Sequence, residues 1–145
     1  MDTLQKMAIE QACARLMNQF AVFNDQGRFE DLVDLFIDDA EYARPIAPDA
    51  IIKGRSNIKA AFESRPKERV GRHIISNIIV EVISAERAVG SCYALLYSGD
   101  INKPAEKFGL QAIPPQLVGE YQDEFVLTPH GWKFSVRKGR IIFTA

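Results

Sequence analysis

One side chain in this sequence lies where it could carry out acid–base chemistry. His73 is one of two histidines and lies in GRHIISNIIVEV, residues 71–82, a segment with the isoleucine and valine content of a buried β-strand. An imidazole accepts a proton near neutral pH, so His73 could act as a general base inside a pocket. The alternative is a structural histidine hydrogen-bonded within the fold, which is the commoner role of a lone histidine in a strand.

Alternation along the strands suggests which side chains could accompany His73. Asn77 would share its face and could bind a polar group of a ligand, or simply pair within the sheet. On a later strand, Tyr121 shares a face with Asp123, and its hydroxyl could reach a ligand or lie at the rim of the core. Asp123 could be a second acid of the pocket or the partner of an arginine such as Arg137, and we favour the ion pair.

Other kinds of chemistry have little support in the sequence. His130 lies in the turn TPHG, far along the chain from His73, and there is no cluster of cysteines and histidines with metal-ligand spacing. A glycine-rich phosphate loop and a Gly-x-Ser-x-Gly elbow are also lacking. We therefore expect no metal site and no cofactor.

Length, charge and cysteine content narrow the class of protein. The 145 residues suit one domain spanning 1–145, and 18 basic against 19 acidic residues give no reason to expect a nucleic-acid partner. Cys13 and Cys92 lie in apolar surroundings and are expected to be reduced core residues. The sequence lacks both a membrane-length apolar run and a signal-peptide pattern, so we expect a cytoplasmic protein without membrane contact.

The elements that must position these residues change character along the chain. A helical period runs from Leu4 to Phe23, with Asp2 or Thr3 as the cap and Gly27 at the end. The later segments are a short second helix in 28–40 with Phe36 on its apolar side, an extended stretch 41–48, a short strand 51–54, a third helix 55–65 and four strands at 70–83, 86–98, 117–128 and 132–144.

The order of helices followed by strands predicts an α+β fold. Tight turns make most of the strand pairs antiparallel, and a curved sheet wrapped around the early helices would leave room for a pocket. The second and third of these four strands are separated by the polar segment 99–116, which is long enough to suggest a lid or an interface element.

The sequence resembles the SnoaL-like branch of the nuclear-transport-factor-2-like superfamily. Three stretches carry the likeness: FNDQGRFEDLVDLFIDDAEY, GRHIISNIIVEV and GEYQDEFVLTPHGWKFSVRK. The resemblance implies a cone-like, curved antiparallel sheet around N-terminal helices, in the manner of a cystatin-like α+β barrel. It covers most of the chain, in the order that the superfamily shows.

Within that superfamily, the scytalone dehydratases and the hexachlorocyclohexane dehydrochlorinases use an aspartate–histidine dyad. The resemblance places the aspartate at Asp25 in FNDQG, the histidine at His73 and a pocket tyrosine at Tyr42 in AEYARP. It implies that Asp25 holds and polarises His73, while Tyr42 or Tyr121 hydrogen-bonds a substrate oxygen. A structural His–Asp pair that ties helix to sheet remains the alternative.

The sequence also departs from both groups of enzymes. At the position of the dehydratases' second histidine it has Ser98 or Tyr97, and of these Ser98 is the candidate for substrate binding. The dehydratases' serine and asparagine correspond roughly to Gly119 and Tyr121. The pocket lysine and arginine of the dehydrochlorinases have no counterpart at the matching positions, and we interpret ESRPKERVGR as only a basic loop that leads into a strand. The resemblance therefore supports proton chemistry without selecting either reaction.

The resulting hypothesis is a cofactor-independent lyase or isomerase that acts on a small hydrophobic substrate, such as a cyclic or aromatic compound. The alternatives are a binding or assembly module like the dioxygenase β subunits, which a cavity filled by Phe20, Phe23 and Phe36 would favour, and a SnoaL-type cyclase or hydrolase. Apolar residues on the back of the sheet predict a homodimer or homotrimer; they include Val89, Leu95, Val126 and RIIF at 140–143.

Overall fold

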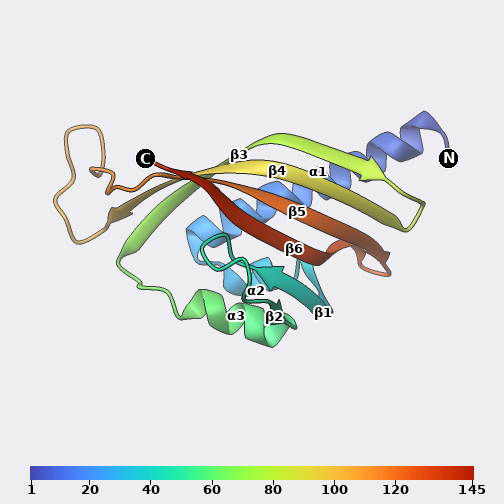
Figure 1. The fold of residues 1–145 in the computed structure, drawn as a ribbon, viewed down its shortest axis with the longest axis horizontal. Helices are drawn as coiled ribbons and strands as arrows, with labels where there is room; N and C mark the ends of the chain where they lie inside the picture. The colour runs from blue at the N-terminus through green and yellow to red at the C-terminus, as the bar shows by residue number, and fades with distance from the viewer.

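The computed structural model describes residues 1–145 as three helices and a six-stranded sheet (Figure 1). The elements are α1 (Thr3–Gln26), α2 (Phe29–Val33), β1 (Phe36–Ala43), β2 (Ile52–Lys53), α3 (Arg55–Glu63), β3 (Arg69–Val82), β4 (Arg87–Asp100), β5 (Leu117–Thr128) and β6 (Gly131–Thr144). The strand order is β2-β1-β6-β5-β4-β3. The predicted α+β class is therefore confirmed.

The sheet is mixed rather than wholly antiparallel. Neighbouring strands from β3 to β6 are antiparallel, but β1 runs parallel to β6 and forms an antiparallel pair only with the short β2. No hairpin turn joins β1 to β6, so no turn dictates an antiparallel direction for that pair. The order also leaves β2 and β3 as the two edges, so the sheet is curved but not closed.

The segment predicted as a second helix divides into a helix and a strand. Only Phe29–Val33 is helical, and β1 begins at Phe36, which pairs with Phe134 of β6. The Phe36 ring is fully buried, with its centroid 5.1 Å from that of Phe134 and 6.0 Å from that of Phe20. The apolar residues of this short stretch fit either period, and pairing with a distant strand decides in favour of the β conformation.

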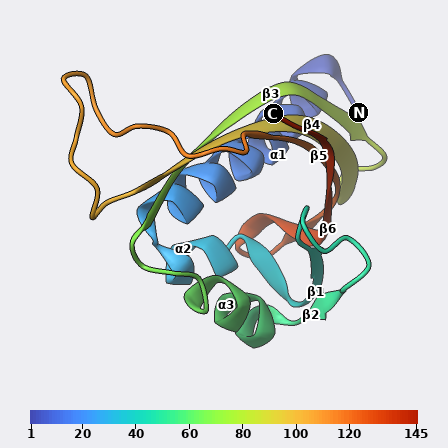
Figure 2. The same cartoon turned by 60° about the vertical axis from the view of Figure 1, so that its left-hand side comes forward.

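Helix α1 lies along the concave face of the sheet, as Figure 2 shows. It begins with a capping box between Asp2 and Gln5 and ends at Gly27, whose φ of 69° is the left-handed conformation that favours glycine. Cys13, Met17 and other apolar side chains along one stripe of the helix are buried against the sheet. The last turn of α1 then carries Asp25 to the side of β3.

Strand β3 contains a bulge that reverses its alternation. The pairing register with β4 shifts between Ser76 and Ile79, and Asn77 has a φ of 54°. Before the bulge His73 is half-buried and faces inward, whereas beyond it Ile78 takes over the inward position and packs against the core. An extra residue in one strand has this effect because side chains alternate with period two.

The outward face of the sheet carries exposed apolar side chains. Ile74, Tyr93 and Tyr97 are exposed on β3 and β4, as are Ile142 and Phe143 near the end of β6. Half-buried residues of this face include Val89, Leu95 and Val126. This surface supports the predicted self-association, which stays a prediction. None of the helices is both long enough and apolar enough to cross a membrane.

Candidate active site

A cavity of about 360 Å³ lies between the concave face of the sheet and the C-terminal ends of α1 and α3. Its lining includes five of the six side chains proposed from the sequence: Asp25, Tyr42, His73, Ser98 and Tyr121. Segments far apart in the chain thus contribute to one wall. The volume falls within the usual range for sites that hold small organic molecules.

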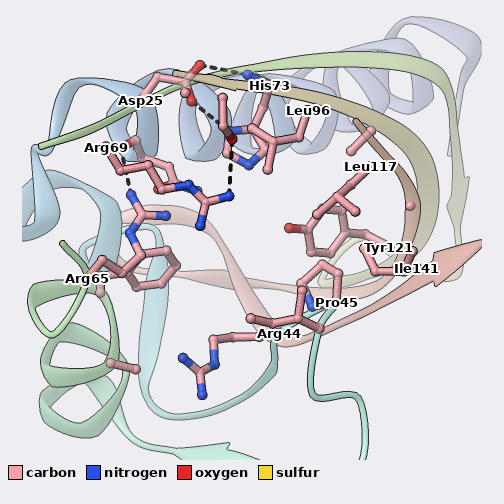
Figure 3. Close-up of a pocket in the computed structure, with 18 of the residues that line it drawn as sticks. Asp25, Arg44, Pro45, Arg65, Arg69, His73, Leu96, Leu117, Tyr121 and Ile141 are labelled. Atoms are coloured by element: carbon pink, nitrogen blue, oxygen red, sulfur yellow. Dashed lines mark hydrogen bonds and ion pairs between the residues drawn. The ribbon is translucent and has the colours of Figure 1, made fainter. Parts of the chain in front are cut away.

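Asp25 and His73 are joined by two hydrogen bonds. Oδ1 of Asp25 is 2.6 Å from Nδ1 of His73, and Oδ2 accepts the backbone N–H of His73 at 2.9 Å. A carboxylate can only accept, so Nδ1 carries the proton and Nε2 holds a free lone pair. No protein group is hydrogen-bonded to Nε2, and the ring lines the cavity (Figure 3). This geometry suits a base, because its reactive nitrogen is both oriented and accessible.

Tyr42 and Tyr121 form a second polar pair in the cavity wall. Their side chains are almost fully buried. Burial raises the pKa of both phenols, so both remain neutral donors. Each hydroxyl can therefore donate a hydrogen bond to a ligand in the cavity.

Ser98 lines the cavity as predicted and is already engaged by an arginine. Its Oγ lies 3.1 Å from Nη2 of Arg69, which donates to it. A hydroxyl that accepts one hydrogen bond still has a proton to donate. Ser98 could therefore hydrogen-bond a ligand atom while remaining held by Arg69.

The expectation that Asn77 shares the cavity with His73 is wrong. Asn77 is exposed and does not line the cavity. The cause is the bulge in β3, which places Asn77 at a positive φ and interrupts the alternation on which the expectation depended. Asparagine tolerates that conformation better than most residues, so a role in the backbone of the bulge accounts for it.

Three arginines that were not predicted from the sequence also line the cavity: Arg44, Arg65 and Arg69. The interpretation of ESRPKERVGR as only a basic loop is wrong, because Arg65 and Arg69 of this segment line the cavity. A signal was available, because Arg69 is four residues before His73 on the same strand and Arg44 is two residues after Tyr42. Period-two alternation places each pair on one face.

Asp123 and Arg137 form the predicted ion pair, but deep in the core. Oδ2 of Asp123 is 3.4 Å from Nη1 of Arg137, and both side chains are fully buried. Burial raises the pKa of Asp123 to about 7, although Arg137 acts in the opposite direction. Neither residue lines the cavity, so the alternative of Asp123 as a second pocket acid is contradicted.

Neither the two cysteines nor a cluster of metal-ligating side chains adds another reactive centre to the cavity. Cys13 and Cys92 are buried free thiols, and burial raises the pKa of Cys13 to about 12. No group of three or more histidine, cysteine, aspartate or glutamate side chains is placed to hold a metal ion. The reactive groups that line the cavity are therefore the Asp25–His73 pair, the tyrosine hydroxyls and the arginines.

A family model described as the SnoaL-like domain matches residues 5–138 of this chain. A candidate scytalone dehydratase from Novosphingobium aromaticivorans superposes with a TM-score of 0.83 at 23% identity, covering 99% of this chain and 91% of its own. The hexachlorocyclohexane dehydrochlorinase LinA-type3 from Novosphingobium barchaimii gives a TM-score of 0.79 at 21% identity, with 99% and 93% covered.

An NTF2-like protein with a cystatin-like fold, also from Novosphingobium aromaticivorans, gives a TM-score of 0.72 at 19% identity, with 96% and 85% covered. No curated protein matches the sequence. At these identities the likeness establishes the fold, and it agrees with the resemblance seen in the sequence.

Proposed function

The chain belongs to the SnoaL-like domain family, and from this premise we propose that it is a cofactor-independent lyase or isomerase. His73 would remove a proton from carbon in a small, largely hydrophobic substrate. The observation that carries the proposal is the Asp25–His73 pair, whose 2.6 Å hydrogen bond leaves Nε2 free at the wall of the cavity. The similar structures described as a dehydratase and a dehydrochlorinase support the same reaction class.

In the proposed reaction, Nε2 of His73 takes a proton from a substrate carbon. Asp25 stabilises the imidazolium that forms, because its carboxylate already accepts the Nδ1–H. Tyr121 donates a hydrogen bond to a substrate oxygen on which negative charge develops. The electron pair of the broken C–H bond then forms a C=C bond as a leaving group departs, or the proton returns to another carbon.

Two alternative functions have less support from the cavity. A cavity filled by Phe20, Phe23 and Phe36 would favour a non-catalytic module, but none of these residues lines the space. A hydrolase of the limonene-epoxide-hydrolase type needs two aspartates beside an arginine, and Asp25 is the one carboxylate in the lining. An open cavity with a single oriented histidine fits proton transfer better.

The test is proton exchange in D₂O with a panel of cyclic and aromatic carbonyl compounds and halogenated rings. Deuterium incorporation and loss of a leaving group are followed by mass spectrometry and NMR, so the assay does not depend on knowing the product. His73→Gln should lower the rate by roughly 10²- to 10⁴-fold, the usual contribution of a general base. His130→Gln is the matched control, because His130 is exposed in a turn.

Exchange or elimination that continues at the wild-type rate in folded His73→Gln would contradict the proposal. Loss of activity in both histidine variants would point to a general effect of substitution rather than to a base at position 73. Circular dichroism on both proteins separates loss of folding from loss of chemistry.

A further inference from the structure

The cavity contains more positive than negative charge. Arg44, Arg65 and Arg69 line it, and Asp25 is its one carboxylate, which is already hydrogen-bonded twice to His73. The chain as a whole has a net charge of only −1, so this imbalance is local. Guanidinium groups are charged at any physiological pH. An empty cavity of this kind therefore presents unmatched positive charge to whatever enters.

The three cavity arginines lack the carboxylate partners that several other arginines of the chain have. Arg28, Arg55 and Arg140 each lie within 4.0 Å of a carboxylate, as salt bridges. None of the cavity arginines does; Arg65 and Arg69 donate only to the Asn24 carbonyl and to Ser98, at 3.5 and 3.1 Å. Nε of Arg44 is buried without any hydrogen-bond partner. An unpaired buried donor is costly, and a ligand atom could satisfy it.

Arg65 is the cavity arginine that is most constrained. Its guanidinium packs over the rings of Phe62 and Phe29, with distances of 5.5 and 5.7 Å to the ring centroids. Burial lowers its pKa, and the nearby positive charge of Arg69 lowers it further. Two like charges held beside each other are stabilised by an anion between them. Figure 3 shows both guanidinium groups on the same side of the cavity, below the Asp25–His73 pair.

The opposite side of the cavity is apolar. Figure 3 places Leu117, Tyr121 and Ile141 across from the arginines, with Pro45 and Arg44 below. A ligand that fits both sides has a charged end and a hydrocarbon body. The lining thus describes an amphiphilic small molecule rather than a neutral one.

We propose that the substrate is a small cyclic or aromatic organic acid whose carboxylate is bound by Arg65 and Arg69. Its hydrocarbon body lies against Leu117 and Ile141. This substrate class rests on the proposed function for its reaction, whereas binding of the acid does not require His73. Arg69 lies on the same strand and face as His73, so the proton removed lies on a carbon near the carboxylate.

A carboxylate fits this cavity better than a phosphate does. Planar guanidinium groups bind carboxylates and phosphates alike in bidentate geometry, so the surroundings of the arginines decide between them. Many phosphate sites also use backbone N–H groups at a helix N-terminus, but here the C-terminal ends of α1 and α3 border the cavity, through Asp25 and Arg65. A helix C-terminus carries partial negative charge, which disfavours a dianion.

The experiment is isothermal titration at pH 7.5 with three acids and their amides: cyclohexanecarboxylate, trans-cinnamate and 2-naphthoate. At least one acid should bind wild-type protein about tenfold or more tightly than its amide, because the acid adds charged hydrogen bonds. Arg65→Gln and Arg69→Gln should each bring that ratio close to one. Arg69 is exposed, so its variant keeps a folded probe available if Arg65→Gln is unstable.

Arg72→Gln is the matched control, because Arg72 lies on the same strand but is exposed outside the cavity. It should keep the preference for the acid, and so should His73→Gln, whose loss of activity tests the proposed function separately. Three acids that bind no better than their amides would overturn the proposal. So would a preference that persists in Arg69→Gln, or one that Arg72→Gln abolishes equally.

Discussion

Asp25–His73 and Asp123–Arg137 both join a carboxylate that is largely shielded from solvent to a basic side chain, yet they differ in almost every other respect. In the first pair both carboxylate oxygens of Asp25 are hydrogen-bonded, at 2.6 and 2.9 Å. In the second pair the closest approach is 3.4 Å, and both carboxylate oxygens of Asp123 lack a hydrogen-bond partner. The first pair lines the cavity, and the second does not.

The surroundings of Arg137 explain its place in the core. Its guanidinium carbon lies 3.8 Å from the ring centroid of Tyr121 and 4.4 Å from that of Phe20, so aromatic faces offset part of the cost of burying its charge. Burial opposes the charge, but Asp123 and other acidic groups outweigh it, and the pKa of Arg137 is raised. The Asp123–Arg137 pair therefore has a structural role in the core, where Arg137 packs against Tyr121 of the cavity wall.

The comparison shows that a perturbed pKa is a poor guide to the active site of this fold. Asp123, with a pKa raised to about 7, is the acid that a search for perturbed carboxylates would select. It has no access to the cavity. The pair that we propose as catalytic differs in that it lines the cavity and both carboxylate oxygens of Asp25 are hydrogen-bonded.

Replacing Asp25 by asparagine should have the largest effect on the first pair. An amide has one acceptor oxygen, whereas His73 presents two donors, the backbone N–H and Nδ1–H. The ring would take the other tautomer, which removes the free lone pair of Nε2 from the cavity. The exchange rate in D₂O should fall by roughly 10²- to 10⁴-fold.

The free energy of unfolding of Asp25→Asn should fall by only about 1 kcal/mol, the usual net contribution of a hydrogen bond. Asp31→Asn, in an exposed salt bridge with Arg28, is the control and should change neither quantity appreciably. Full activity in the Asp25→Asn protein would show that the Asp25–His73 pair is not catalytic.

Replacing Arg137 by methionine should act in the opposite way, on stability rather than on chemistry. It leaves Asp123 buried without a partner, and breaking such a pair typically costs about 3 kcal/mol or more. Chemical denaturation measures the loss. Arg140→Met, in the more exposed pair with Glu120, is the control and should cost less than about 1 kcal/mol.

The exchange rate of folded Arg137→Met at 25 °C should stay within a few-fold of wild type. Equal free energies of unfolding for the Arg137 and Arg140 variants would show that the buried pair contributes no more to stability than the exposed pair does. Loss of exchange activity in a folded Arg137→Met protein would place Arg137 in the chemistry.

Much of the fold could be predicted from local sequence. Regular helical spacing, Asp2 and Gly27 locate α1, and alternating apolar residues between turns locate β5 at the predicted residues 117–128. Phe36 could not be assigned in this way, because its conformation depends on pairing with a strand about a hundred residues later. The bulge at Asn77 likewise arises from sheet geometry that a period-two pattern does not contain.

Less of the candidate site than of the fold could be predicted from local sequence. Asp25 and His73 are 48 residues apart, and only the resemblance to a family linked them. Arg69 could have been found from alternation with His73, and its place in a basic run concealed it. Arg65 lies beyond the C-terminus of α3, where no periodic pattern indicates which way a side chain points.

The pH dependence of stability offers the finest test of the comparison. Burial raises the pKa of Asp123 from 3.8 to about 7 in the folded protein. The folded state therefore favours the neutral acid, whose stabilising contribution is complete below about pH 4 and is lost as the pH rises through 7. Between pH 5 and 8 the free energy of unfolding of wild type should fall by roughly 2 to 3 kcal/mol relative to Asp123→Asn.

Denaturation of both proteins across this range measures the difference, in which the contributions of the titratable groups that both proteins share cancel. A difference that does not vary with pH would mean that Asp123 is ionised throughout this range because Arg137 stabilises its carboxylate.

The pH profile of the exchange rate provides the complementary measurement. It should be the same in wild type and Asp123→Asn, since Asp123 has no contact with the cavity. A shifted profile would indicate that the Asp123–Arg137 pair influences the Asp25–His73 pair through Tyr121, which contacts Arg137 and lines the cavity.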